Sequence, residues 1–166
     1  MQTRLPTEER QAEIVAAALK LARDVSPVSI TTTTDANGYF RVNIGGLKQP
    51  LVASVQRSGN AWKSAMVDVI QGCRTSFYTL NLTGLTDLVL SEVALAAGVT
   101  GGSDAVTPAV LAANPSRVSS AVQTVNQRVS TQLQAAGLDP TNFNPLTTAF
   151  RPNLTGYDQV LESVSI

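Results

Sequence analysis

The sequence predicts an α+β protein in which a small antiparallel β-module packs against a helical C-terminal region. Residues 26–82 contain short runs of alternating or β-branched residues separated by turn signals, which is typical of paired strands. Residues 83–166 carry apolar residues at helical spacing between capping residues. Residues 1–25 hold eight of the 24 charged residues and form a third segment. We expect residues 26–82 and residues 83–166 to form one compact unit, with residues 1–25 as a charged N-terminal helix.

The charged N-terminal segment predicts an amphipathic helix over about residues 7–24. Thr7 is a suitable N-cap residue, and Ser26-Pro27 ends the pattern. Its apolar residues at helical spacing are Ile14, Ala18, Leu21 and Val25. We expect this helix to cover the sheet, because soluble helices usually cover their own core, and a partner-binding helix is the alternative.

The most specific local signal is a turn at Asp35–Gly38. A threonine run, Thr31–Thr34, precedes it, and alternating Phe40, Val42 and Ile44 follow it. Asp and Asn support tight turns, and Gly tolerates positive φ. The pattern predicts a hairpin of two strands, residues 28–34 and 39–44.

Three further strands are predicted after this hairpin. Residues 50–56 and 61–70 flank a second turn at 57–60, and residues 76–82 form the last strand. Trp62, the only tryptophan, is expected to anchor the sheet. The result is a meander of about five strands joined by short turns.

Four helices are predicted in the second half from their caps and stops. The first comprises residues 86–97, with Thr86 as its cap and Gly98 at its end, and the second is a short helix from Pro108. The third comprises residues 115–136 and ends at Gly137, and the fourth is a short helix from Thr155. The irregular residues 138–154 are expected to be held on the core by Phe143, Leu146 and Phe150.

Composition excludes several kinds of partner. The net charge is zero and no basic stripe occurs, so a nucleic-acid binder is not expected. No run of 18 apolar residues occurs, so no membrane span is expected. Met1–Pro6 lead into a charged segment, so we do not expect them to begin a signal peptide. Only 14% of residues are charged, against roughly 25% in typical soluble proteins. Such a composition fits an exported or envelope protein, or an ordinary β-rich domain with a hydroxyl-rich surface.

The chain lacks the usual residues of catalysis. Histidine is absent, which removes the commonest general base and every Ser-His or Cys-His arrangement. Cys73 is the only cysteine, so an internal disulfide or a cysteine-based zinc site is excluded. We therefore predict a non-enzyme and assign no catalytic, cofactor-binding or metal-binding residue.

Two carboxylate pairs are the remaining candidates for acid–base chemistry. They are Asp87 with Glu92, and Asp158 with Glu162. The second pair has i, i+4 spacing, so both carboxylates lie on one helix face and repel each other. Solvated helix surface is the favoured interpretation of both pairs.

Two other constellations are weaker. Asp35 and Asn37 are suitable calcium ligands, but turn chemistry accounts for both. An intramolecular isopeptide bond would join Lys48 or Lys63 to Asn81, but no supporting glutamate motif accompanies them. We expect both lysines to lie at the surface.

Four motifs carry a family resemblance. The run Thr-Thr-Asp-Ala-Asn-Gly-Tyr-Phe at 33–40 resembles the hairpin of carboxypeptidase-regulatory-like (transthyretin-like) β-sandwich domains of bacterial exported proteins. Residues 80–88, 144–150 and 155–161 are similar to a helical companion region of bacterial envelope lipoproteins and surface proteins. The resemblance covers roughly residues 28–166 and implies a non-catalytic module outside the cytoplasm.

One departure from that family concerns the start of the chain. Such sandwiches begin with two strands that the predicted charged helix replaces here. A truncated sandwich would expose a sheet edge and an apolar face. The helix covers that face, a partner covers it, or the first 25 residues are not native to the module.

These observations predict a structural or interaction module of an exported bacterial envelope or surface protein, which binds a glycan or a protein. Contact with a partner or a second copy through the exposed sheet edge is expected to be available. A carboxylate-dependent glycan hydrolase is one alternative, and it requires a cleft with two convergent carboxylates among aromatic residues. A small-ligand carrier is the other, and it requires a closed apolar cavity between sheet and helices.

Overall fold

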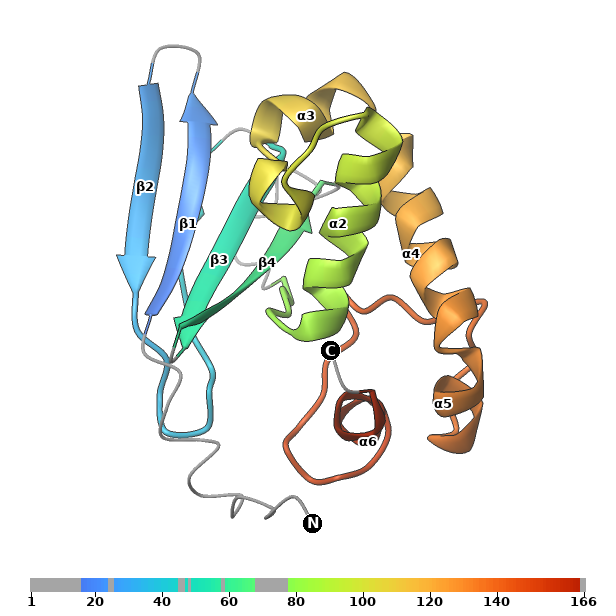
Figure 1. Ribbon diagram of the computed structural model, residues 1–166. Coiled ribbons are helices and arrows are strands. Elements are labelled where there is room, and N and C mark those ends of the chain that lie inside the picture. Colours follow the sequence, from blue (N-terminus) through green and yellow to red (C-terminus); the bar gives the residue numbers. More distant parts are fainter. Residues whose placement is uncertain are drawn as a thin grey trace.

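The computed structural model describes residues 16–23, 26–44, 47, 49–57, 59–67 and 78–164. It confirms the predicted α+β class, with an antiparallel sheet packed against helices (Figure 1). The strands are β1 (Ala16–Arg23), β2 (Ser26–Thr32), β3 (Leu51–Arg57) and β4 (Asn60–Met66). The helices are α2 (Gly84–Ala97), the 3-10 turn η1 (Gly102–Ala105), α3 (Pro108–Ala113), α4 (Ser116–Arg128), α5 (Ser130–Ala135) and α6 (Tyr157–Ser163).

The strand order in the sheet is β2-β1-β3-β4, and all described pairs are antiparallel. β1 is therefore central: Leu19 lies opposite Ile30 of β2 and opposite Ala53 of β3. The predicted order, a meander in which the 50–56 strand pairs with the hairpin before it, is wrong. β3 returns to the other side of β1, so the turn at Asp35–Gly38 lies on a connection between strands two places apart.

The predicted N-terminal helix is also wrong over residues 16–23, which form β1. The run Ala-Ala-Ala-Leu-Lys-Leu-Ala-Arg favours a helix by intrinsic propensity, and its pairing within the sheet overrides that preference. As a central strand, β1 hydrogen-bonds on both sides, with β2 and with β3. Residues 7–15 of the predicted helix lie outside the described residues. The sheet therefore begins before residue 26, the expected boundary of the β-module.

Two other predicted strands, residues 39–44 and 76–82, are not formed by those of their residues that the structure describes. Residues 39–44 and 78–82 have no assigned strand pairing, and residues 76–77 lie outside the described part. Residues 39–44 nonetheless keep the predicted alternation, because Tyr39, Arg41 and Asn43 are exposed whereas Phe40, Val42 and Ile44 are half-buried. The 61–70 strand is confirmed as β4 over residues 60–66, and residues 68–70 are not described.

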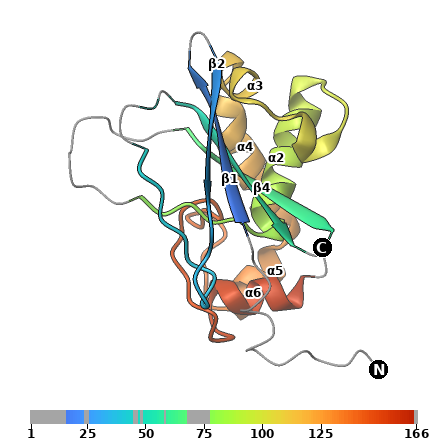
Figure 2. The same cartoon turned by 90° about the vertical axis from the view of Figure 1, so that its left-hand side faces the viewer.

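The sheet is covered on both faces (Figure 2). On one face, Val52 and Ala65 join the main core, which is otherwise built by the helices and the C-terminal loop. On the other face, Leu51 and Ala53 meet the extended segments that follow β2 and precede α2. Those segments contribute Val42, Ile44, Leu47, Leu80 and Leu82. Unpaired extended chain thus occupies the place that a second sheet would take in a sandwich.

The N-cap of helix α2 is Thr83 and not the predicted Thr86, so the helix begins three residues earlier than predicted. The two threonines form a capping box: the Thr83 N–H donates to Thr86 Oγ1 (2.9 Å), and the Thr86 N–H donates to Thr83 Oγ1 (3.3 Å). Gly98 ends the helix as predicted, in the left-handed conformation at φ 70°. α3 begins at Pro108 with Thr107 as its cap, also as predicted.

The predicted helix 115–136 is present as two helices, α4 and α5, which meet at Val129. Val129 leaves helical geometry (φ −106°, ψ 20°), although its carbonyl still accepts from the Leu133 N–H. Ser119, Ser120 and Thr124 hydrogen-bond to carbonyls of their own helix, an arrangement that bends helices. The break itself falls at Val129, a β-branched residue of the buried stripe, and such residues lower intrinsic helicity.

Candidate functional site

The three C-terminal motifs meet in one buried hydrogen-bonded cluster, which we call the motif junction. It comprises Asn81 and Thr83 from the first motif, Pro145 and Thr148 from the second, and Tyr157 from the third. Asn81 Nδ2 donates to the carbonyls of Pro145 (2.9 Å) and Thr148 (2.8 Å). The Asn81 backbone N–H donates to the Leu146 carbonyl (2.9 Å). These bonds attach the C-terminal loop to the segment just before α2.

Tyr157 connects the third motif to the other two. Its hydroxyl donates to the Pro145 carbonyl (3.1 Å) and lies 3.0 Å from Thr83 Oγ1. Since the tyrosine has a single hydroxyl hydrogen, the Thr83 hydroxyl is the donor in the second contact. The ring packs edge-on against Phe143 and at a tilt against Phe150, with centroid distances of 4.9 and 4.7 Å. Tyr157 therefore joins loop, helix cap and core, and it confirms the expected role of Phe143 and Phe150.

The junction is closed to solvent. Tyr157 is 2% exposed, Asn81 8% and Thr83 9%. Burial raises the pKa of the Tyr157 hydroxyl above its ordinary value, and the hydrogen bond from Thr83 opposes that rise only in part. A buried, protonated phenol with both of its hydrogen-bond partners inside the protein is suited to holding structure together, and no substrate reaches it in this arrangement.

Alkaline pH is expected to destabilise the protein through Tyr157. Because its pKa is higher in the folded than in the unfolded chain, the folded state holds the proton longer. The free energy of unfolding is therefore unaffected by this group below about pH 10 and falls as the pH rises beyond it. Urea unfolding between pH 8 and 11 measures the slope. Tyr157→Phe should reduce the alkaline slope, and an unchanged slope would contradict the assignment.

The carboxylate pairs do not converge. Asp87 Oδ1 accepts from the backbone N–H of Lys63 on β4 (2.9 Å), and Glu92 forms an ion pair with Arg128 of α4. Each carboxylate of this pair thus joins α2 to a different neighbour. Asp158 Oδ2 accepts from the Leu154 N–H at the start of α6 (2.6 Å).

The lysine and the asparagine of the predicted cross-link do not come together either. Lys63 Nζ contacts the carboxylate of Asp104 at 3.0 Å and its carbonyl at 3.2 Å, whereas the Asn81 amide is held in the motif junction. The two are therefore engaged with different partners, and no Lys–Asn cross-link geometry is formed. Lys48 and Cys73 lie outside the described residues. Glu162 is exposed on α6.

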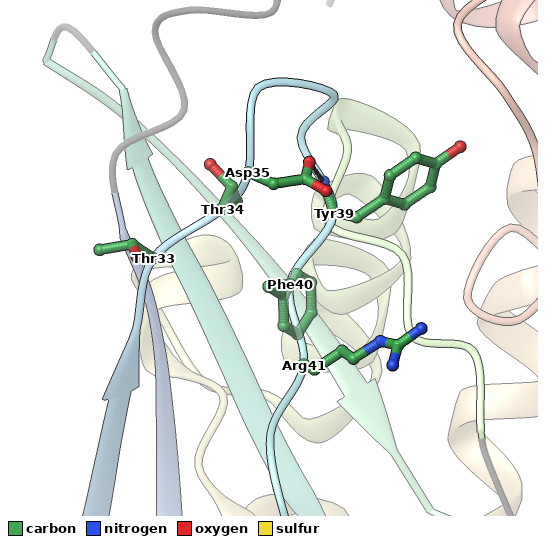
Figure 3. A pocket seen from close by; sticks show the side chains of 6 residues that line it. All are labelled: Thr33, Thr34, Asp35, Tyr39, Phe40 and Arg41. Atoms are coloured by element: carbon green, nitrogen blue, oxygen red, sulfur yellow. Dashed lines mark hydrogen bonds between the residues drawn. The ribbon is translucent and has the colours of Figure 1, made fainter.

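The accessible candidate is a groove of about 530 Å³ at the predicted hairpin turn (Figure 3). It is lined by both arms of the turn: Thr33, Thr34, Asp35, Tyr39, Phe40 and Arg41. Tyr39 and Arg41 project to the same side of the arm that leaves the turn (Figure 3). Tyr39 is 49% exposed, and it is not among the ring contacts found in the described part of the chain.

Asp35 fixes the shape of this groove. Its Oδ1 accepts from the backbone N–H groups of Asn37 (2.8 Å) and Tyr39 (2.9 Å). The Gly38 N–H donates to the Asp35 carbonyl (3.0 Å), and the Asp35 N–H donates to the Tyr39 carbonyl (2.8 Å). Asp35 therefore serves the turn, as predicted. No group of three or more metal-ligating side chains occurs within the described residues.

Sequence reasoning assigned no role to Thr83, Pro145 or Tyr157, although it selected the motifs that contain them. The signal that was available is the residue type: Asn81 and Thr83 are uncharged polar residues among leucines, and Tyr157 carries a hydroxyl in a segment that continues with Val160 and Leu161. Such residues are buried only when they are hydrogen-bonded.

Comparison with known proteins gives no match: no family model, curated protein or solved structure matches this chain. Within the described residues, no helix combines the length and the apolar character needed to cross a membrane.

Proposed function

We propose that this chain is a non-catalytic structural or interaction module of an exported bacterial envelope or surface protein, and that it binds its partner at the groove beside the Asp35–Gly38 turn. The observation that carries the proposal is that three of the four motifs are buried while the fourth is exposed. The three C-terminal motifs are engaged in the closed motif junction, whereas the turn motif presents an exposed tyrosine and an open groove.

A binding role fits the groove better than hydrolysis does. A glycan hydrolase requires two convergent carboxylates. Among the described residues that line the groove, Asp35 is the one carboxylate, and its Oδ1 accepts from backbone N–H groups. Asp87 and Glu92 hold different neighbours of α2. A small-ligand carrier would need an enclosed apolar cavity, whereas this groove is open at the surface and lined by polar side chains as well as aromatic ones.

Cell fractionation tests the location on which this proposal depends. Antibodies raised against the chain should detect the parent protein in the envelope or medium of its bacterium, and protease added to intact or outer-membrane-permeabilised cells should degrade it. A cytosolic protein that resists protease until the cells are lysed would contradict the proposal. A cytosolic marker enzyme controls for lysis.

A further inference from the structure

We infer that Asp87 closes the β4 edge of the sheet against the addition of a further strand, and that two copies of the chain pair through β4 when this contact is removed. β4 is the outer strand on its side of the described sheet. An outer strand presents unpaired backbone N–H and C=O groups, on which a strand of another chain can align. At β4, one of these groups is already bonded within the molecule, because the Lys63 N–H donates to Asp87.

The register of the β3–β4 hairpin shows which N–H groups of β4 point outward. Arg57 lies opposite Asn60 across a tight turn, and this closing pair is hydrogen-bonded within the hairpin. Hydrogen-bonded and non-hydrogen-bonded pairs alternate along an antiparallel ladder. Lys63 and Ser54 therefore form a non-hydrogen-bonded pair, and the Lys63 N–H points away from β3. Its bond to Asp87 has the direction that a bond to a further strand would have.

Asp87 reaches this N–H from helix α2, which lies beside β4 (Figure 1). Asp87 Oδ1 accepts from the Lys63 N–H at 2.9 Å in a partly buried position. The side chain of Lys63 is held as well, because its Nζ lies 3.0 Å from the Asp104 carboxylate of η1. Lys63 is the middle residue of β4. A strand that aligned with β4 would therefore have to displace the Asp87 carboxylate from the centre of the edge.

The other outer strand of the described sheet, β2, is blunted in a different way. β1 and β2 form the same kind of hairpin, in which Arg23 lies opposite Ser26. Pro27, the second residue of β2, therefore takes an outward position, where proline has no N–H to offer. Ala61 is the equivalent residue of β4 and retains its N–H. β4 thus depends on Asp87 where β2 has a proline, and strand addition at β4 is not the way in which this chain meets a partner.

Sedimentation equilibrium of the full chain tests the inference. Asp87→Ala removes the acceptor, so its weight-average mass should exceed that of the wild type and rise towards that of a dimer or larger species with concentration. Asp87→Asn removes the same charge from the first turn of α2 but keeps an oxygen acceptor, so it should match the wild type. Glu92→Ala is the matched control, because it removes a contact that α2 makes with Arg128 and not with β4.

A second substitution separates strand pairing from unfolding. Ala61→Pro in the Asp87→Ala background places a proline where β2 has one, and it should return the mass to the wild-type value. Association that arises from loss of folding would not be reversed by this change.

Hydrogen exchange in the wild type supplies a test that needs no substitution. Lys63 and Ala61 both direct their N–H groups outward, but only the Lys63 N–H is known to have an acceptor, and Ala61 is exposed. The Lys63 amide should therefore exchange much more slowly than the Ala61 amide.

Each contrary result overturns the inference. A wild-type mass for Asp87→Ala would show that the contact does not close the edge. Equal association of the Asn variant or of Glu92→Ala would show that the lost acceptor is not the cause. Association that persists with Ala61→Pro would place the contact elsewhere than at β4. Exchange at Lys63 as fast as at Ala61 would show that the Asp87 contact does not protect the edge.

Discussion

Replacing Tyr157 with alanine is expected to lower the free energy of unfolding by about 3–5 kcal/mol, the range for loss of a buried aromatic side chain. The variant loses both ring contacts, with Phe143 and Phe150, and the hydroxyl that joins Thr83 to the Pro145 carbonyl, which keeps only the bond from Asn81. Urea unfolding followed by far-UV circular dichroism measures the change.

Two variants separate the causes of this loss. Tyr157→Phe keeps the ring and removes the hydroxyl, so the buried Thr83 hydroxyl loses its acceptor. The free energy of unfolding should therefore fall by about 1–3 kcal/mol, the range for a buried polar group left unsatisfied. Tyr39→Ala removes an exposed tyrosine and should change stability by no more than about 0.5 kcal/mol. If Tyr157→Ala were as mild as Tyr39→Ala, Tyr157 would not be the connection between loop and core.

Asn81→Asp is the second large effect. The substitution replaces an amide that donates to two carbonyls with a carboxylate that faces the same two oxygens, in a position that is 8% exposed. An uncompensated buried charge costs about 3–5 kcal/mol. We therefore expect a cooperative transition at much lower urea concentration than in the wild type at pH 7.

The pH dependence of this variant identifies the cause. Burial and the facing carbonyls raise the pKa of the introduced carboxyl group in the folded state, so the penalty develops as the pH rises above about 4. The difference from wild type should consequently be smaller at pH 4 than at pH 7. Asn153→Asp is the matched control: Asn153 is exposed, and its Oδ1 accepts from Thr155, which a carboxylate can also do. Equal effects of the two substitutions would contradict the buried role of Asn81.

Local signals in the sequence were sufficient for the ends of helices in the second half of the chain and for the turn at Asp35–Gly38. Gly98 ends α2, Thr107 and Pro108 begin α3, and Asp35–Gly38 form a turn, because each depends on backbone preferences of a few neighbouring residues. The error in the start of α2 is small. The helix starts at Gly84 because Thr83 and Thr86 form a capping box, which the sequence analysis did not identify.

Long-range pairing was not predictable in the same way. The residues of β1 favour a helix by intrinsic propensity, and their pairing with β2 and β3 overrides that preference. The segment 39–44 shows the opposite case, since its alternation is that of a strand while no strand pairing is assigned to it. Both errors arise because a strand depends on partners that lie far along the sequence.

The turn groove and the motif junction differ in the same way in how far the sequence predicts them. The described residues that line the turn groove lie within nine positions of each other, from Thr33 to Arg41, and the turn chemistry was predicted from those residues. The motif junction joins residues that are 64 to 74 positions apart, such as Asn81 with Pro145 and Thr83 with Tyr157. The motifs were visible in the sequence, but their meeting point was not.

Hydrogen exchange at the Asn81 backbone amide tests most directly whether the C-terminal motifs build one structural junction. This N–H donates to the Leu146 carbonyl, so its protection requires that the first two motifs remain together. We predict protection as strong as that of the buried amides of α2 and α4, which corresponds to exchange through global unfolding. Rapid exchange at Asn81 while α2 and α4 remain protected would show that the loop detaches independently, and it would contradict the account.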